Sequence, residues 1–204
     1  MSLKNVKLIY FDARGRGEVI RLMFAAAGVK YDDVRHTTET WPAEKPKMPF
    51  GQLPVLVVDG KLYAQSVAIA TFVAKEAGFY PKTAIDGLKV DQVVQLAVDL
   101  QILTFKAFFE KDEAKKSQLE KELNDVEVPK YLDFFEKLLK ESGTGFVVGN
   151  TLTLADFYVY QVVTMVPGRV GDTTKHPLLN GLVQKIESNA NVKTYLANRK
   201  KTDI

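Results

Sequence analysis

The sequence contains no cysteine, and histidine occurs only at His36 and His176. Without cysteine the chain can form no disulfide, no thiolate metal site and no cysteine nucleophile. The two histidines stand apart from any cluster of other metal ligands, so we expect no metal site. If the protein carries out sulfur chemistry, the sulfur must come from another molecule.

An excess of charge of one sign is also missing. The 204 residues include 28 basic and 25 acidic side chains, a net charge of +3, which is too balanced to favour nucleic acid or an anionic membrane as partner. No apolar run approaches the length that spans a bilayer, and the first residues lack the apolar stretch and cleavage site of a secretory signal. We therefore expect a cytoplasmic protein with no nucleic-acid partner and no membrane partner.

Short strand-like and helix-like segments alternate over the first 80 residues. β-Branched and aromatic residues indicate the strands, and the turn Asp59-Gly60 indicates a hairpin between the last two. Helix starts and stops, such as Glu18 and Gly28, indicate the helices. The expected strands are residues 6–11, 31–35, 54–58 and 61–63, the expected helices are 18–27 and 66–77, and a proline-rich loop covers 37–49.

This order, β-α-β-loop-β-β-α, is typical of an α/β thioredoxin-like domain with a mixed four-stranded sheet, here residues 1–80. A thioredoxin carries Cys-x-x-Cys after its first strand. The corresponding residues are Tyr10-Phe11-Asp12-Ala13, so dithiol redox chemistry is excluded.

The rest of the chain has helical character throughout. Residues 81–87 are expected to form a short linker, followed by an all-α domain over 88–204. The charged run 110–127 is interpreted as a solvated helix face and turn. Thr153 and Asp156 have the spacing of a capping box at a helix start, which is a folding signal. The expected helices are residues 88–109, 128–140, 177–187 and 192–197, with one more beginning after Thr153.

Several short segments, each weak alone, occur in one order along the chain. They are Tyr10-Phe11, Arg14-Gly15-Arg16-Gly17-Glu18, Trp41-Pro42, Pro49-Phe50-Gly51-Gln52-Leu53-Pro54-Val55-Leu56, Asp59-Gly60, Gln65-Ser66-Val67-Ala68-Ile69-Ala70 and Thr153-Leu154-Ala155-Asp156-Phe157. The series resembles the sigma-like cytosolic glutathione transferases, which include invertebrate members and the haematopoietic prostaglandin D synthases. The resemblance covers nearly the whole chain. It implies a glutathione-binding thioredoxin-like domain, a helical domain that supplies most of the second-substrate site, and a homodimer.

The resemblance makes Tyr10 and Arg16 the catalytic pair. Tyr10 would donate a hydrogen bond to the sulfur of glutathione and favour the thiolate, and Arg16 would be the nearby cation. The alternatives are an ordinary strand tyrosine and a surface arginine. A cation at a helix start opposes the helix dipole, so local stability does not explain Arg16.

Other segments match the positions that hold glutathione. Gln65 and Ser66 precede a helix whose N-terminal amides suit the γ-glutamyl carboxylate; alternatively Ser66 is only an N-cap. A cis Pro54 would present the Leu53 backbone to the cysteinyl part of glutathione, whereas a trans proline that starts a strand is the alternative. The full set of expected glutathione-binding residues is Tyr10, Arg16, Trp41, Lys45, Gly51, Gln52, Leu53, Pro54, Gln65, Ser66 and Asp99.

Trp41, Lys45 and Asp99 would hold the two ends of glutathione. Trp41 and Lys45 match positions that hold the glycyl end of glutathione, although Lys45 is equally read as a solvated loop charge. Asp99 lies in a stripe with Asp91 and Gln95 that has helical spacing and can simply face water. The resemblance instead puts this stripe at the dimer cleft, with Asp99 reaching the partner's glutathione.

The site for the second substrate, the electrophile, is matched by Phe11, Ala13, Arg14, Lys106 and the C-terminal Ile204. Prostaglandin D synthases usually carry tryptophan where Lys106 stands, which argues against prostaglandin synthesis here. The sequence thus predicts a glutathione S-transferase that uses glutathione as co-substrate, without a metal, and conjugates it to hydrophobic electrophiles in detoxification. The alternatives are a glutathione-dependent prostaglandin isomerase or peroxidase, and a non-catalytic ligand-binding or structural member of the fold.

Overall fold

A computed structural model describes residue 3, residues 5–165 and residues 175–202 of the chain. The chain forms two compact units. The first holds residues 1–80 together with 187–204, and the second holds residues 81–186. The C-terminal residues therefore belong with the thioredoxin-like part, whereas the sequence assigned all of 88–204 to the helical domain.

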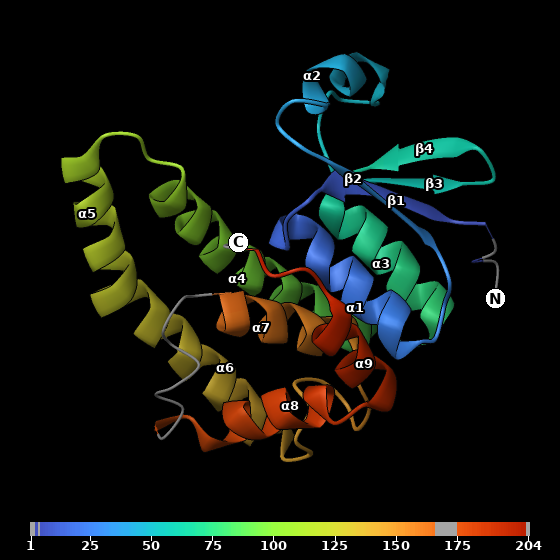
Figure 1. Ribbon diagram of the computed structural model, residues 1–204. Helices are drawn as coiled ribbons and strands as arrows, with labels where there is room; N and C mark the ends of the chain where they lie inside the picture. The colour runs from blue at the N-terminus through green and yellow to red at the C-terminus, as the bar shows by residue number, and fades with distance from the viewer. Residues whose placement is uncertain (1–2, 4, 166–174, 203–204) are drawn as a thin grey trace. The chain divides into compact units, whose positions relative to one another are not determined.

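The first unit is built on a mixed four-stranded sheet, as predicted. The strand order is β2-β1-β3-β4; β1 (Lys7–Phe11) runs parallel to β2 (Asp32–His36), and β3 (Val55–Val58) runs antiparallel to both β1 and β4 (Lys61–Ala64). Helices α1 (Glu18–Ala26) and α3 (Ser66–Ala77) lie side by side on one face of the sheet (Figure 1). Helix α9 (Ala190–Asn198) packs against α1.

The predicted loop over residues 37–49 was wrong in part, because it contains helical turns. Helix α2 covers Trp41–Glu44, and a 3₁₀ turn covers Lys45–Lys47. Pro42 and Pro46 each lie at the start of one of these turns. Proline is favourable at a first helical position, where its missing N–H costs nothing, so it started structure here instead of interrupting it.

The second unit is helical. It contains α4 (Ala84–Phe108), α5 (Glu113–Glu122), a π-helical turn (Leu123–Glu127), α6 (Val128–Ser142), α7 (Leu154–Met165) and most of α8 (Pro177–Glu187). The expected linker 81–87 is shorter than predicted, because the Thr83 hydroxyl accepts a hydrogen bond from the Asp86 amide (3.2 Å) and caps α4. The charged helix α5 has no buried residue, as expected for a solvated face.

The start of α7 is fixed by Asp156, which is fully buried. Its carboxylate accepts hydrogen bonds from the backbone amides of Thr153 (2.7 Å) and Val147 (2.8 Å). The Thr153 hydroxyl also donates to this carboxylate (2.8 Å), whereas the predicted capping box had it bonding a free amide. Asp156 thus connects the loop before α7 to the helix itself.

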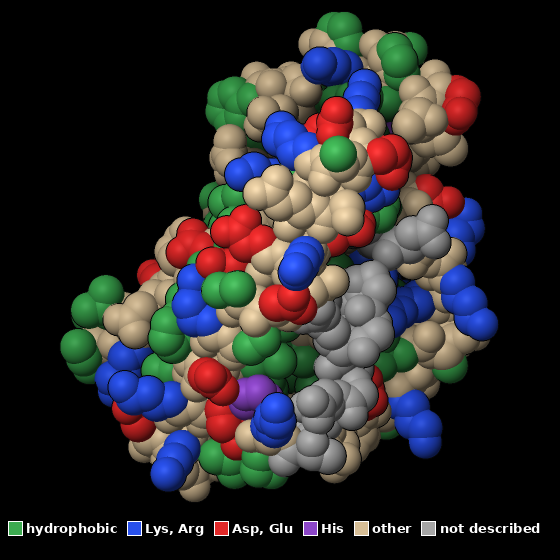
Figure 2. Space-filling model, turned by 90° about the vertical axis from the view of Figure 1, so that its left-hand side faces the viewer, with side chains coloured by type: hydrophobic (Ala, Val, Ile, Leu, Met, Phe, Trp, Pro, Cys, Tyr) green, Lys and Arg blue, Asp and Glu red, His purple; other side chains and the backbone are tan. Residues whose placement is uncertain are grey.

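Surface chemistry agrees with the balanced composition. On the face drawn in Figure 2, basic and acidic side chains are interspersed. Among the described residues, no helix combines the length and the apolar character that a membrane span requires.

Candidate active site

The end of β1 positions the candidate catalytic residue, Tyr10. Its side chain is only 7% exposed, and its phenol oxygen accepts a hydrogen bond from the backbone amide of Arg16 (2.9 Å). Because this amide occupies an acceptor lone pair, the hydroxyl proton of Tyr10 remains available to donate to a ligand. Tyr10 is therefore held as a hydrogen-bond donor.

The turn after β1 fits closely around the Tyr10 ring, a feature that sequence reasoning missed. A Cβ atom on Gly15 would lie 2.5 Å from the Tyr10 hydroxyl, and one on Gly17 would lie 2.6 Å from the ring carbon Cδ1. Gly15 also has a φ of +39°, in the left-handed region that favours glycine. The alternation of arginine and glycine in this turn was the signal available in the sequence.

Burial raises the pKa of Tyr10, opposed by the hydrogen bond from the Arg16 amide and by the charges of Arg16 and Arg21. Tyr10 consequently keeps its proton at neutral pH and is able to donate a hydrogen bond. Arg16 contacts Tyr10 through its backbone amide, and its side chain is exposed. The role of the Arg16 cation beside the sulfur stays a prediction. The buried cation at this site is Arg21, whose guanidinium carbon lies 5.6 Å from the centre of the Tyr10 ring.

Strand register brings the other candidate residues of the first unit to the same end of the sheet. Ile9 pairs with Val55, and Val55 pairs with Ala64 on its other side. Because β3 is antiparallel to both neighbours, the end of β1, the start of β3 and the end of β4 meet at one edge. Tyr10, Pro54 and Gln65 each lie one residue beyond these paired positions.

Gln65 precedes α3 in an unusual backbone conformation. Its φ is +77° and its ψ is 108°, which costs a residue other than glycine about 1–3 kcal/mol and is common at ligand sites. The Gln65 side chain makes no capping hydrogen bond. Ser66 is the first residue of the helix, so the alternative in which Ser66 is the N-cap does not apply. The N-terminal amides of this twelve-residue helix form a suitable seat for a carboxylate.

The peptide bond between Leu53 and Pro54 is cis, as the family resemblance implied. Pro54 is buried, and Leu53 packs against the cluster of Ile9, Met48 and Val55. On the same segment Gln52 is exposed and Gly51 has a φ of +59°.

Trp41 and Lys45 come from the two helical turns before this segment. The Trp41 ring packs edge-on against Phe11, with ring centres 5.5 Å apart. Lys47 pairs with Glu44 (2.7 Å), but Lys45 has no carboxylate partner within the described parts of the chain. An unpaired cation next to Trp41 suits a ligand carboxylate.

The predicted electrophile residues are divided between the units. Phe11 ends β1, and Ala13 and Arg14 lie in the turn that follows it. Lys106 is exposed in the last turn of α4. Ile204 lies outside the described residues. Asp99 is also exposed on α4, in line with Asp91 and Gln95, and the roles of Asp99 and Lys106 stay predictions.

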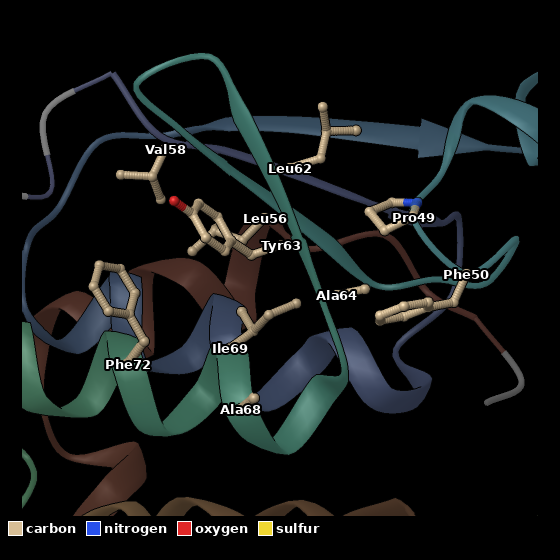
Figure 3. A pocket seen from close by; sticks show the side chains of 10 residues that line it. All are labelled: Pro49, Phe50, Leu56, Val58, Leu62, Tyr63, Ala64, Ala68, Ile69 and Phe72. Atoms are coloured by element: carbon tan, nitrogen blue, oxygen red, sulfur yellow. The ribbon is translucent and has the colours of Figure 1, made fainter.

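A further hollow in the first unit was not foreseen. It lies between the β3–β4 hairpin and α3 and has a volume of about 500 Å³. Figure 3 shows Pro49 and Phe50 at one end, and Val58 and Phe72 at the other. The lining is mostly apolar, and Phe50 is 64% exposed.

Comparisons with known proteins agree with this geometry. Residues 6–75 match the family model "Glutathione S-transferase, N-terminal domain", and residues 98–199 match "Glutathione S-transferase, C-terminal domain". Glutathione S-transferase 1 of Ascaris suum is 37% identical over 98% of this chain and 99% of the relative. Hematopoietic prostaglandin D synthase of Gallus gallus is 34% identical over 99% of this chain and all of the relative. A solved structure of Na-GST-3, a monomeric glutathione S-transferase from Necator americanus, superposes with a TM-score of 0.84 at 35% identity, covering 98% and 100% of the two chains.

Proposed function

Because this chain belongs to the glutathione S-transferase family and is a transferase, we propose that Tyr10 activates the thiol of glutathione for attack on hydrophobic electrophiles. The observation that carries this mechanism is the 2.9 Å hydrogen bond from the Arg16 amide to the Tyr10 oxygen. It fixes the phenol at the end of β1 and leaves its proton free to donate to a ligand. The burial of Tyr10 supports the same role, because a desolvated donor acts more strongly on an anion.

The energy required is modest. A free thiol has a pKa of about 8.5, so little of it is ionised at neutral pH. Lowering this pKa by about two units needs about 2.7 kcal/mol of preferential thiolate stabilisation. A charge-assisted hydrogen bond from Tyr10, with Arg16 and Arg21 nearby, is sufficient in a partly dry site. Binding also positions the sulfur beside the electrophile, so proximity adds to activation.

The rest of glutathione would be held along the sheet edge that carries Tyr10. We assign its γ-glutamyl carboxylate to the N-terminal amides of α3 behind Gln65 and Ser66. The Leu53 backbone would pair with the cysteinyl part, in the manner of an added strand. Trp41 and the unpaired Lys45 would hold the glycyl carboxylate, with Gly51 and Gln52 lining the same edge.

Tyr10→Phe tests the mechanism. It should lower kcat by about 10²-fold or more, since a donor to the reacting atom typically contributes that much. The affinity for glutathione should stay within a few-fold, because the backbone contacts remain. In the wild type, kcat/KM should rise with pH through one ionisation well below 8.5, and in Tyr10→Phe this limb should move toward the value of the free thiol, about 8.5. Near wild-type turnover in Tyr10→Phe would mean that another group activates the sulfur.

The second substrate is proposed to be a small planar electrophile or a lipid-derived enal. Lys106 is exposed and places a flexible stem with a hydrated charge where an aromatic wall would bury apolar area. The similarity to a prostaglandin D synthase keeps prostaglandin isomerisation as the second candidate. A panel of a halonitrobenzene, enals, lipid peroxides and prostaglandin H2, assayed on purified protein, separates the two.

We also propose a homodimer with composite sites, although a relative of similar length is described as monomeric. Exposed apolar side chains support association: Phe50 is 64% exposed, Tyr63 51%, and Leu88 on α4 62%. Specific interfaces bury such groups over about 800 Å² per partner. In a dimer the exposed Asp99 carboxylate would pair with the amino group of the partner's glutathione.

Asp99→Asn tests the composite site, with Asp91→Asn on the same stripe as its control. Asp99→Asn should weaken glutathione binding by roughly 1.5–3 kcal/mol, the contribution of a charge-assisted bond, and Asp91→Asn should not. Sedimentation at micromolar concentration gives the oligomeric state. A monomer that binds glutathione normally would contradict the proposal. The cytoplasmic location stays a prediction, which cell fractionation would test.

A further inference from the structure

Glu18 is a buried carboxylate at the start of α1, and its two strongest partners come from the C-terminal residues. It is 3% exposed. The Tyr195 hydroxyl on α9 donates to one of its oxygens (2.9 Å), and the Arg199 guanidinium donates to the other (2.7 Å). A carboxylate so far from water is costly unless it is paired and hydrogen-bonded. Glu18 therefore depends on residues more than 170 positions away in the sequence.

One turn further along α1, Arg21 is completely buried. Its guanidinium donates to the carbonyl oxygens of Ala13 (2.6 Å) and Phe11 (3.3 Å), and to the Asp33 carboxylate (3.2 Å). These two carbonyls belong to the last residue of β1 and to the turn after it, directly behind Tyr10. Arg21 thus holds the backbone that positions Tyr10 and also contributes a positive charge beneath its ring.

Glu18 and Arg21 act on each other. The Nη1 atom of Arg21 that bonds Ala13 also lies 3.7 Å from a Glu18 oxygen, so the same nitrogen faces both acceptors. With Arg199 in place, the Glu18 charge is compensated from the other side. Without Arg199, the Glu18 carboxylate would draw the Arg21 guanidinium away from the Ala13 carbonyl. The negative charge of Glu18 would also offset the positive charge of Arg21. Both changes disfavour an anion beside Tyr10.

A second link, between Lys200 and Asp12, reaches the same turn. The Lys200 ammonium bonds the Asp12 carboxylate (2.8 Å), which also pairs with Arg35 (3.0 Å). The Lys200 hydrogen bond, opposed by partial desolvation and helped by Arg35, lowers the pKa of Asp12. Lys200 is largely exposed, so this surface pair contributes little. The buried link through Arg199 is the stronger one.

We infer that α9 and Arg199, the residue that directly follows it, form a positioning element for thiol activation, in which Arg199 compensates the Glu18 charge so that Arg21 can hold the turn behind Tyr10. The inference rests on the proposed role of Tyr10. Glu18, Arg21 and Arg199 are positioning residues, since they act on the sulfur only through Tyr10 and its turn. The charged and titratable groups around them in the described part of the first unit are Tyr195, Lys200, Tyr31, Asp33, Arg35, Asp12 and Arg16.

The test measures the pKa of the bound glutathione thiol, from the ultraviolet absorbance of the thiolate as a function of pH. Arg199→Met removes the charge and keeps an apolar stem. A charge within 4–6 Å shifts a pKa by about 1–3 units, and Glu18 acts from one side chain further away, so we expect a rise of about 0.5–1 unit. The affinity for glutathione should stay within about twofold, which separates loss of activation from general damage.

Three variants complete the design. Lys193→Met removes an exposed cation from α9 itself and should leave the thiol pKa unchanged. Arg199→Lys should restore most of the wild-type value. Glu18→Gln combined with Arg199→Met removes both charges and should bring the thiol pKa back to within about 0.3 unit of the wild type, since no uncompensated charge remains.

Tyr195→Phe provides a readout if the Arg199 variants fold poorly, because it removes one hydrogen bond to Glu18 and keeps the ring. It should raise the thiol pKa in the same direction by a smaller amount. The inference is overturned if the thiol pKa rises in neither Arg199→Met nor Tyr195→Phe. It is also overturned if Lys193→Met raises the thiol pKa by the same amount as Arg199→Met. Tyr10→Phe is measured in parallel. If Tyr10→Phe leaves the thiol pKa unchanged, the proposed function fails. If Tyr10→Phe is the only variant that raises the thiol pKa, the role of Tyr10 stands and only the role of α9 fails.

Discussion

Replacing Gly15 by alanine should damage catalysis through a single added methyl group. The new Cβ would lie 2.5 Å from the Tyr10 oxygen and 3.2 Å from its ring carbon Cζ. A carbon–oxygen contact normally needs about 3.3 Å, so the phenol or the turn must move by roughly 0.8 Å. The 2.9 Å bond from the Arg16 amide would then lengthen or lose its alignment.

Gly15→Ala should carry two separate costs, one in catalytic rate and one in stability. A displacement of about 1 Å in a catalytic group can cost about 10²-fold in rate, so kcat/KM should fall by about 10–10²-fold. The φ of +39° at Gly15 adds about 1–2 kcal/mol of strain for a residue with a Cβ. Glutathione affinity should change little, because Leu53 and the N-terminus of α3 are not touched.

Gly78→Ala is the matched control. Gly78 ends α3 with a φ of +83°, and a Cβ there would meet nothing within 4 Å. The Gly78→Ala variant should lose a similar amount of stability, about 1–2 kcal/mol, measured by urea unfolding. Its kcat/KM with a halonitrobenzene should equal that of the wild type. If the two alanine variants lose equal amounts of activity, strain and not contact with Tyr10 is responsible, and the reasoning is refuted.

Two further predictions concern the second unit. Asp156→Ala leaves the buried amides of Thr153 and Val147 without an acceptor. The free energy of unfolding, measured by urea titration, should therefore fall by about 3 kcal/mol. A loss below about 1 kcal/mol would show that the carboxylate is dispensable. Lys106→Trp should raise kcat/KM for bulky lipid substrates relative to a halonitrobenzene, since an aromatic wall adds apolar contact. Efficient, selective prostaglandin D2 formation by the wild type would contradict the open pocket and favour the isomerase.

Local signals were enough to predict most of the fold. Helix α3 was predicted with its observed bounds, because Gly78 and the hairpin before it leave little freedom. The turns over residues 41–47 were missed because proline was read only as a breaker. The placement of residues 187–202 was missed for a different reason: the bond between Arg199 and Glu18 spans 181 positions, and a charged residue near a chain end gives no sign of its partner.

The sequence proposes the candidate site as a set of residues, whereas their arrangement comes from the structure. Tyr10, Pro54 and Gln65 were found from short segments, and strand register explains why they meet. The fit of Gly15 against the phenol and the positive φ of Gln65 depend on backbone angles. Arg21 was overlooked because a single cation on an apolar helix face usually reads as a solvated side chain.

The bonds between Glu18 and α9 have a consequence for the newly synthesised chain. Residues 1–80 leave the ribosome long before residues 187–202, which complete the same unit. At about 5–20 residues per second, the intervening stretch of roughly 100 residues takes about 5–20 s to translate. During that interval the Glu18 carboxylate has neither Tyr195 nor Arg199, and the second unit is made before the first can close. If Arg199 holds the turn behind Tyr10 as proposed, that turn reaches its final form only after residues 187–202 have been made.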